Sequence, residues 1–419
     1  MNVTSVPHWL RGAAAFQAAA GSLPVVASRA RQSAPNLGLV AELVNLAGVT
    51  VQRAAWDDLT ERALEPNVFM ESAFLLAAVL HMAVSKRPKF LLVWDRPGAG
   101  AARRLVGLCP VQSQAFARIG AARVWLSKQS CNGSPLLDKS MAVETLRAMA
   151  DYLSGGKTGA AALAFSKVPQ AGKVAAAIRE LAAATGRELA ISDAHMRAAL
   201  VGGPTALAAF EAQPSLHQRK ELRRKRLRLE AEGAVRFETV STPQDVRPAI
   251  EEFLKLEASG WKGRCGTAFL SNPGQAAFVR TLSRDLARQG KCRVDTLLLN
   301  DRPVAMGIVL NSGGLAAFWK TTYDETFAAQ SPGVLLCHEL SRLQLQDGAV
   351  AFTDSCAIAH HPMINGIWRE RIEIADMLLA ARAGGQLGYG LAHARASVTA
   401  SLRMRAKSIF YWLSARKMS

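Results

Sequence analysis

The spacing of hydrophobic residues alternates along the chain between the two-residue period of strands and the longer period of helices. In the first half, short apolar runs bounded by Gly and polar turns predict strands at 89–94, 105–111, 123–126, 161–165 and 189–191. Helical periodicity predicts helices at 56–63, 72–84, 141–153 and 171–185. This alternation indicates a mixed α/β fold.

The second half repeats the same order of elements. We expect a strand at 235–239, helices at 245–259 and 273–289, and a β-meander that begins at Cys292. A further helix then begins at Ser331, a strand covers 349–353, and a last helix covers 363–381. The shared order suggests structural duplication, although no strong repeat of individual residues accompanies it.

A strongly basic segment separates the halves. Seven Lys/Arg residues and four leucines occur within 214–233, which predicts a helix between two domains. RNA binding is the alternative interpretation, but no aromatic residue interleaves with the charges to stack on bases. We therefore divide the chain into an extension (1–38), two α/β domains (39–205 and 206–380) and a basic tail (381–419).

Length and charge restrict the classes of partner. A chain of 419 residues favours two domains over one core. The formal net charge of +18 indicates an anionic partner: a phosphorylated cofactor, RNA, an acidic polysaccharide or an anionic membrane face. The longest apolar run, 72–85, is too short to cross a bilayer. Six cysteines without a CxxC pair favour reduced thiols in a cytoplasmic protein.

The segment Ser331-Pro332-Gly333 carries a signal for anion binding. Pro332 suits the first helical position, Ser331 can cap the helix, and Gly333 lets a ligand approach the backbone. The free N–H groups and the positive end of the helix dipole then favour a phosphate group. We expect an acyl-CoA pyrophosphate to bind here through Gln330, Ser331, Gly333 and Val334.

Several separated segments resemble one enzyme family. They are Trp56–Leu59, Asn67–Ser72, Lys220–Leu229, Arg302–Gly307, Lys320–Glu325, Gln330–Leu336, Phe352–Ala357 and His361–Arg371. Over about residues 40–380 the chain resembles the GNAT superfamily of acyl-CoA N-acyltransferases. It is similar in particular to tandem-domain acetyltransferases of the CelD/BcsL type, linked to cellulose and exopolysaccharide synthesis, and distantly to the FemABX peptidyl transferases.

The resemblance implies a chemistry and a set of site residues. In the family motif Q/R-x-x-G-x-G/A, Gln330 and Gly333 match, whereas Leu335 replaces the last small residue. This departure leaves room for an acyl-carrier-protein arm or an aminoacyl-tRNA as the carrier. The family layout places the acyl carbonyl near Trp319 and Lys320, where backbone N–H groups would bind the oxyanion. No metal is expected.

Candidate acid–base groups surround that position. Asp354 would activate the acceptor, with His361 as a second candidate base and Tyr323 as the acid toward the leaving thiolate. Each has a structural alternative: a turn cap for Asp354, loop packing for His361 and a buried strand end for Tyr323. Trp368 and Arg371 would line the acceptor cleft, or else lie on an amphipathic helix.

These features together predict an acyl-CoA-dependent acyltransferase with two tandem GNAT-like domains. The acceptor would be an amine or hydroxyl of an envelope or exopolysaccharide precursor. The alternatives are a FemABX-like transferase that uses aminoacyl-tRNA, and a non-catalytic scaffold that binds a membrane or a synthase. In the tail, Phe410, Tyr411 and Trp412 with flanking cations suggest peripheral attachment to the inner membrane face.

Overall fold

The computed structural model describes residues 38–82, 87–96, 102–113, 120–155, 158–384 and 387–395. Nearly all of the predicted extension (1–38) lies outside the described residues, and so do Phe410, Tyr411 and Trp412 of the tail. Within the described part, no helix is long and apolar enough to cross a bilayer. Residues 387–395 form a helix whose Tyr389 is buried and donates its hydroxyl to the carbonyl of Leu378 (3.2 Å).

The first half contains the following elements: β1 (Leu39–Val44), α1 (Leu46–Thr50), α2 (Arg53–Glu61), the 3₁₀ helix η2 (Val68–Met70), α3 (Ser72–His81), β2 (Lys89–Asp95), β3 (Arg104–Ser113), β4 (Ala121–Val124), β5 (Leu136–Leu137), α4 (Ala142–Ser154), β6 (Ala162–Pro169), α5 (Lys173–Thr185) and β7 (Leu189–Val201). Apart from the short elements, the predicted positions agree with these bounds. β7 extends much further than the strand predicted at 189–191.

The second half contains the following elements: α6 (Ala206–Ala212), α7 (Leu216–Glu230), β8 (Val235–Val240), α8 (Pro243–Ser259), α9 (Trp261–Arg264), η3 (Phe269–Ser271), α10 (Pro273–Arg288), β9 (Cys292–Leu299), β10 (Arg302–Ser312), β11 (Leu315–Tyr323), η4 (Glu325–Gln330), α11 (Pro332–Gln346), β12 (Phe352–Asp354), α12 (Ile364–Ile367) and β13 (Glu370–Ala380). The basic segment is the helix α7, as predicted, and Ser215 and Gln218 form a capping box at its start.

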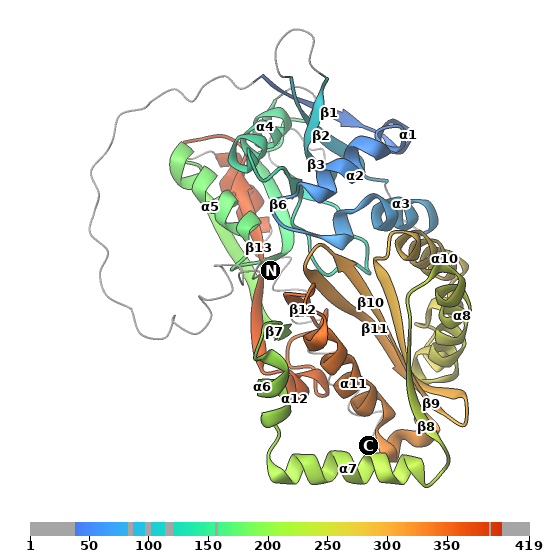
Figure 1. The fold of residues 1–419 in the computed structure, drawn as a ribbon. Coiled ribbons are helices and arrows are strands. Elements are labelled where there is room, and N and C mark those ends of the chain that lie inside the picture. The colour runs from blue at the N-terminus through green and yellow to red at the C-terminus, as the bar shows by residue number, and fades with distance from the viewer. Residues whose placement is uncertain are drawn as a thin grey trace, which may run out of the picture.

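One mixed sheet contains all 13 strands, in the order β1-β2-β3-β4-β6-β13-β7-β12-β11-β10-β9-β8, with β5 beside β3. Neighbouring strands are antiparallel except for two parallel pairs, β4–β6 and β11–β12. α8 and α10 cover one face of the C-terminal strands and α11 covers the other (Figure 1). The fold is thus mixed α/β, as expected.

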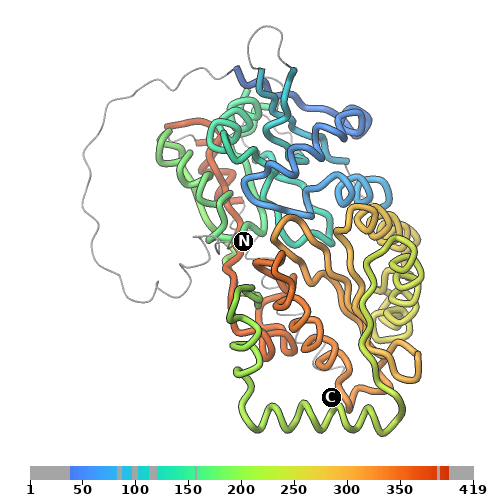
Figure 2. Tube along the Cα trace, viewed as in Figure 1, coloured from blue at the N-terminus to red at the C-terminus, as the bar shows by residue number. Residues whose placement is uncertain are grey.

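The two halves exchange their last strands at the centre of the sheet. β7 pairs with β12 of the second half, and β13 pairs with β6 of the first half. Figure 2 shows the red trace of β13 running beside the green trace of β7. The predicted boundary at 205/206 is untested and stays a prediction, and these strands cross it.

The helix predicted over 363–381 is wrong. Only Ile364–Ile367 is helical, and Glu370–Ala380 is a strand in which Ile372 and Ile374 are buried while Glu373 between them is exposed. Hydrogen bonding to strands on both of its edges outweighs the helical preference of this Ala- and Leu-rich segment, because strand formation depends on distant partners.

A shared hydrophobic core joins the halves. α3 packs against α10, and the ring of Phe74 lies edge-on to Phe278 (5.5 Å) and to Trp319 (6.2 Å). Aromatic pairs in this arrangement add to the free energy gained from burial alone. The first half therefore supports β11 directly, and β11 is the strand where acyl-carbonyl contacts were predicted.

Candidate functional site

Strands β11 and β12 are paired over only a short length. Their parallel register runs from Leu315↔Phe352 to Ala317↔Asp354 and ends there, although β11 continues to Tyr323. Beyond Ala317 this edge of β11 has no β12 partner. The backbone next to Trp319 and Lys320 is therefore the part of β11 that could contact a ligand lying between the strands.

A β-bulge lies in the same stretch of β11. The register with β10 shifts so that Val309 faces Phe318 and Ile308 faces Lys320, which leaves Trp319 as the extra residue. Because of the bulge, Trp319 and Lys320 share one face of the sheet. The Lys320 ammonium lies 5.3 Å from the ring centroid of Trp319 and 5.5 Å from that of Phe269. Burial lowers the pKa of Lys320.

Asp354, at the end of β12, is held in an ion pair. Its partner is Arg197 of β7, whose side chain is only 4% exposed. The other carboxylate oxygen of Asp354 accepts the backbone N–H of Cys356 (2.9 Å). Asp354 therefore also caps the turn after β12. Arg197 also donates to the carbonyl of Cys131 (3.0 Å). These contacts link β7, β12 and the segment after β4.

The segment after β4 enters the region where β11 and β12 separate. The carbonyl of Gln129 accepts the indole N–H of Trp319 (2.9 Å), and Lys167 donates to the carbonyl of Ser130 (2.7 Å). The thiol of Cys131 lies 3.9 Å from the carbonyl of Cys356. A residue of the first half is thereby fixed beside the bulge of the second half.

The two thiols have different ionisation properties. A hydrogen bond from Cys356 and the nearby cations Arg197 and Lys320 together lower the pKa of Cys131 to about 7, against the effect of burial. Burial raises the pKa of Cys356 well above its ordinary value of 9.0. Cys131 is therefore the more acidic thiol of the pair.

The start of α11 is a helix N-terminus without a side-chain cap, in which Pro332 and Gly333 are buried. Ser331 is in the left-handed region (φ 51°), and its carbonyl accepts the N–H groups of Val334 (3.0 Å) and Leu335 (3.3 Å). The side chain of Ser331 does not cap the helix, and the first turn contains no acidic residue. A Cβ at Gly333 would lie 3.6 Å from the Tyr323 ring, which is an ordinary contact.

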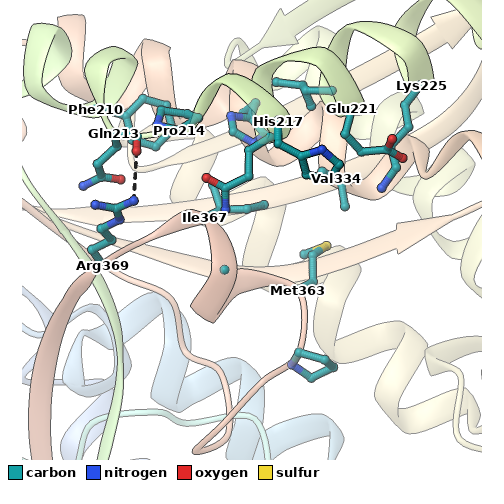
Figure 3. Close-up of a pocket in the computed structure, with 15 residues that line it drawn as sticks. Phe210, Gln213, Pro214, His217, Glu221, Lys225, Val334, Met363, Ile367 and Arg369 are labelled. Atoms are coloured by element: carbon teal, nitrogen blue, oxygen red, sulfur yellow. Dashed lines mark hydrogen bonds between the residues drawn. The ribbon is translucent and has the colours of Figure 1, made fainter.

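A cavity of about 370 Å³ lies between α7, α11 and α12. Figure 3 shows Val334 from α11 and Met363 from the start of α12 on one side, and His217 and Lys225 of α7 on the other. Arg369 lies at one end, where it donates to the carbonyl of Gln213 (2.8 Å). The cavity therefore combines apolar walls with cationic groups, and it adjoins the first turn of α11.

The remaining predicted residues have other neighbours. His361 accepts the N–H of Ile364 through Nδ1 (3.4 Å), and burial lowers the pKa of His361. Trp368 is fully buried and donates its indole N–H to Ser341 (2.7 Å), so it belongs to the core and does not line a cleft. The guanidinium of Arg371 donates to the carbonyls of Trp368 and Asn365, which occupies it in fixing α12 to β13.

The predicted residues thus fall into two groups. Trp319, Lys320 and Asp354 lie around the bulge, whereas Tyr323, Gly333 and Val334 lie at the start of α11. The sequence did not identify Arg197 and Cys131, which complete the first group. One signal for Arg197 was present: it is the only cation of β7, directly before an apolar run. In the described part of the chain, no three His, Cys, Asp or Glu residues could hold a metal ion.

Comparison with known proteins identifies the type of the second domain. The family described as "Acetyltransferase (GNAT) domain" matches residues 217–356, from α7 to the end of the β12 region. This segment is similar to a GNAT domain. The match includes the bulge, the start of α11 and part of the cavity wall. No curated protein matches the sequence.

Two solved structures are similar to the chain over most of its length. A crystal structure of FemX is 9% identical, covers 77% of this chain and 95% of its own, and gives a TM-score of 0.50. The C-terminal DUF2156 domain of a putative lysylphosphatidylglycerol synthetase from Agrobacterium fabrum is 11% identical, covers 84% and 96%, and also gives 0.50. At such identities the similarity shows a common fold.

Proposed function

We propose that the protein is an acyltransferase that uses an acyl-CoA and transfers the acyl group to an amine or hydroxyl of an envelope or exopolysaccharide precursor. The observation that carries this proposal is the coincidence of three features within the GNAT domain. They are the end of β11–β12 pairing, the bulge at Trp319, and a cavity that adjoins the first turn of α11. The acceptor class comes from the resemblance alone.

The carrier would bind on the α11 side of the sheet. The pyrophosphate would lie at the first turn of α11, near Gly333, where no carboxylate competes for the positive end of the helix dipole. The pantetheine arm would follow the cavity between α11 and α12 toward the bulge. Lys225 and Arg369 would provide positive charge along the cavity.

The acceptor would approach from the opposite face, next to α9 and η3. Lys320 is the titratable side chain on that face beside the bulge, between the rings of Trp319 and Phe269. Its pKa is lowered by burial, so a larger fraction is the neutral amine that can accept a proton from the acceptor. We therefore assign the role of general base to Lys320.

Asp354 and His361 remain candidate bases, but the contacts of each residue favour a different role. The ion pair with Arg197 makes Asp354 a positioning residue that fixes β7 and the Cys131 segment. His361 is kept neutral by burial but lies next to Pro362 and Met363, on the carrier side. Tyr323, the candidate acid, lies beside Gly333, where the pyrophosphate would bind, so its role toward the leaving thiolate at the bulge stays a prediction.

A contact through Glu325 connects the two proposed binding regions. This residue begins η4, which leads into α11, and its carboxylate accepts the N–H of Trp261 (2.6 Å) and a proton of Arg264 (2.5 Å) in α9. A bound carrier that displaced η4 would therefore also affect α9, the segment that faces the acceptor, and the coupling between the two regions would be reciprocal.

The second candidate function is a transferase that uses aminoacyl-tRNA. The observation in its favour is the exposed basic face of α7, beside the cavity. Such a carrier would need a long cationic track. Binding of acetyl-CoA would favour the first candidate, and binding of charged tRNA without acetyl-CoA binding would favour the second.

The test of the proposed function is release of free CoA thiol from acetyl-CoA with a panel of amino sugars, sugar alcohols and simple amines. We expect acceptor-dependent release by the wild type and a reduction of about 10²–10⁴-fold in Lys320→Met, the usual contribution of a general base. Lys255→Met, which removes an exposed ammonium of α8 that pairs with Glu252 (2.8 Å), is the control. Equal rates in wild type and Lys320→Met would contradict the assignment.

A further inference from the structure

Helix α7 carries more positive charge than its neighbours neutralise. Arg224 pairs with Glu221, and Arg226 pairs with Glu230 and Glu339. Arg219 donates to the carbonyls of Pro214 and Ala212, and the four remaining cations of this helix form no ion pair with any residue that the structure describes: Lys220, Arg223, Lys225 and Arg228. Three of them, Lys220, Arg223 and Arg228, are exposed.

The position of α7 relates these charges to the proposed carrier site. Leu229 is buried and Leu222 partly buried in a cluster with Leu335 and Leu336, which fixes α7 against the first turns of α11. Lys225 faces the cavity of about 370 Å³, and Arg223 faces a second cavity of about 270 Å³ that includes Leu335 and His338. The exposed cations therefore border the site where a carrier would enter.

Exposed apolar groups occur on the same helix. Leu216 is 76% exposed and Leu227 is 53% exposed, and no aromatic side chain other than His217 occurs on α7. Cations mixed with leucines over a helix of about 22 Å fit an amphipathic acidic helix. They fit RNA less well, because RNA binding relies on contacts to a longer run of phosphates and on stacking of bases against aromatic side chains.

We propose that the exposed face of α7 docks an acyl carrier protein, a small acidic protein that bears its acyl group on a phosphopantetheine arm. The acidic helix of this partner would lie against Lys220, Arg223 and Arg228, with Leu216 and Leu227 contacting its apolar residues. The arm would then enter the cavity beside Lys225. This inference rests on the proposed function, since the same arm is the reactive end of CoA.

The test measures carrier protein and CoA separately. Fluorescently labelled holo-acyl carrier protein of the bacterial fatty-acid type is titrated with the full chain, and CoA binding is measured by calorimetry. The variant is Lys220→Glu/Arg223→Glu/Arg228→Glu. The matched control is Lys89→Glu/Lys139→Glu/Arg247→Glu, which changes the net charge equally at exposed sites elsewhere. A labelled tRNA mixture is titrated in parallel.

We expect the wild type to bind the carrier protein and the binding to weaken as salt is added. The α7 variant should bind it about tenfold or more weakly, the control should bind it as the wild type does, and all three should bind CoA equally. Absence of carrier-protein binding, or equal loss in variant and control, overturns the docking surface while CoA binding preserves the proposed function. If tRNA binds through α7 and the carrier protein does not, the surface is an RNA site and the proposal is wrong. Absence of binding to both CoA and the carrier protein removes both proposals.

Discussion

Both halves of the molecule place a short parallel strand pair beside a helix, and they differ in how the chain leaves the first strand of that pair. In the N-terminal half, β4 pairs with β6 from Ala121↔Ala162 to Arg123↔Ala164. In the C-terminal half, β11 pairs with β12 over an equally short register. Each first strand leads to a helix on the same sheet, α4 or α11.

The N-terminal half occupies its own strand junction. The chain between β4 and α4 folds back as β5, whose Leu136 and Leu137 are buried against β3. A Cβ at Gly133 would lie 2.1 Å from the carbonyl oxygen of Ser166, so this segment is packed directly on β6. Because its own chain occupies the junction, this half is suited to support and not to ligand binding.

In the C-terminal half the junction is occupied by Gln129 and Cys131 of the other half and not by the half's own chain. The connection from β11 to α11 is the short helix η4, and a cavity follows between α11 and α12. α4 carries Glu144 in its first turn, whereas α11 carries no acidic residue there. The difference teaches that duplication lets one half become the scaffold that positions Gln129 and Cys131 at the site of the other.

The largest expected effect tests whether the halves are joined through the Arg197 ion pair. Arg197→Met leaves the buried carboxylate of Asp354 without its partner, which typically costs about 3–5 kcal/mol of unfolding free energy. The measurement is denaturant unfolding. Arg179→Met is the control, because Arg179 contacts only Gln170 within the first half. A loss no larger than that of the control would mean that the pair does not join the halves.

A pH effect of intermediate size comes from Glu65 in the N-terminal half. Its carboxylate accepts the N–H of Val174 (3.1 Å) at the start of α5, so this half fills a helix terminus with its own side chain. Burial raises the pKa of Glu65 above 4.5. The folded chain then holds the proton more tightly, so the free energy of unfolding decreases as pH rises through the raised pKa.

Unfolding curves between acid and neutral pH measure this effect. Each tenfold difference in proton affinity between folded and unfolded chain corresponds to about 1.4 kcal/mol. Glu65→Gln should show a smaller decrease over the same range. Glu180→Gln, an exposed carboxylate on α5, is the control for loss of one charge. Identical pH profiles for wild type and Glu65→Gln would rule out the titration of Glu65.

The smallest expected effect concerns the thiol that the first half places at the bulge. With a pKa of about 7, Cys131 should react with iodoacetamide at a rate that rises through neutral pH, while Cys356 reacts only at much higher pH. Peptide mass spectrometry reports each site. Cys356→Ala removes the hydrogen-bond donor and should move the Cys131 profile to higher pH. An unchanged profile would show that Cys356 does not control Cys131.

Local patterns predicted most of the elements of both halves, because the formation of these elements depends mainly on residues that are close in the sequence. The basic helix α7, the meander and the start of α11 at Pro332 are examples. They could not predict β13, since its strand conformation depends on β6 and β7 far away in the chain. The strand exchange depends on the same long-range pairing.

The candidate site was predicted in part for the same reason. Trp319, Lys320, Asp354 and Gly333 lie where the order of elements placed them, but their contacts depend on other segments. Asp354 forms an ion pair with Arg197 and is therefore not a free carboxylate. Trp368 was expected either in the acceptor cleft or in the core beneath an amphipathic helix, and it is fully buried, although its segment is not a long helix. Neither relation is visible without the arrangement of β7, β12 and α11.

The central claim is that a CoA-type carrier binds at α11 and not at its counterpart α4. The direct measurement is calorimetric titration of acetyl-CoA into the wild type, Gly333→Glu, Gly333→Ala and Val143→Glu, where Val143 is the second residue of α4 as Gly333 is of α11. We predict that the wild type binds acetyl-CoA and that Gly333→Glu abolishes binding through bulk and charge repulsion. Gly333→Ala should retain binding, because a Cβ at Gly333 meets only ordinary contacts. Val143→Glu should retain binding because it changes α4 and not α11. No wild-type binding, or loss of binding in Val143→Glu with binding retained in Gly333→Glu, would contradict the account.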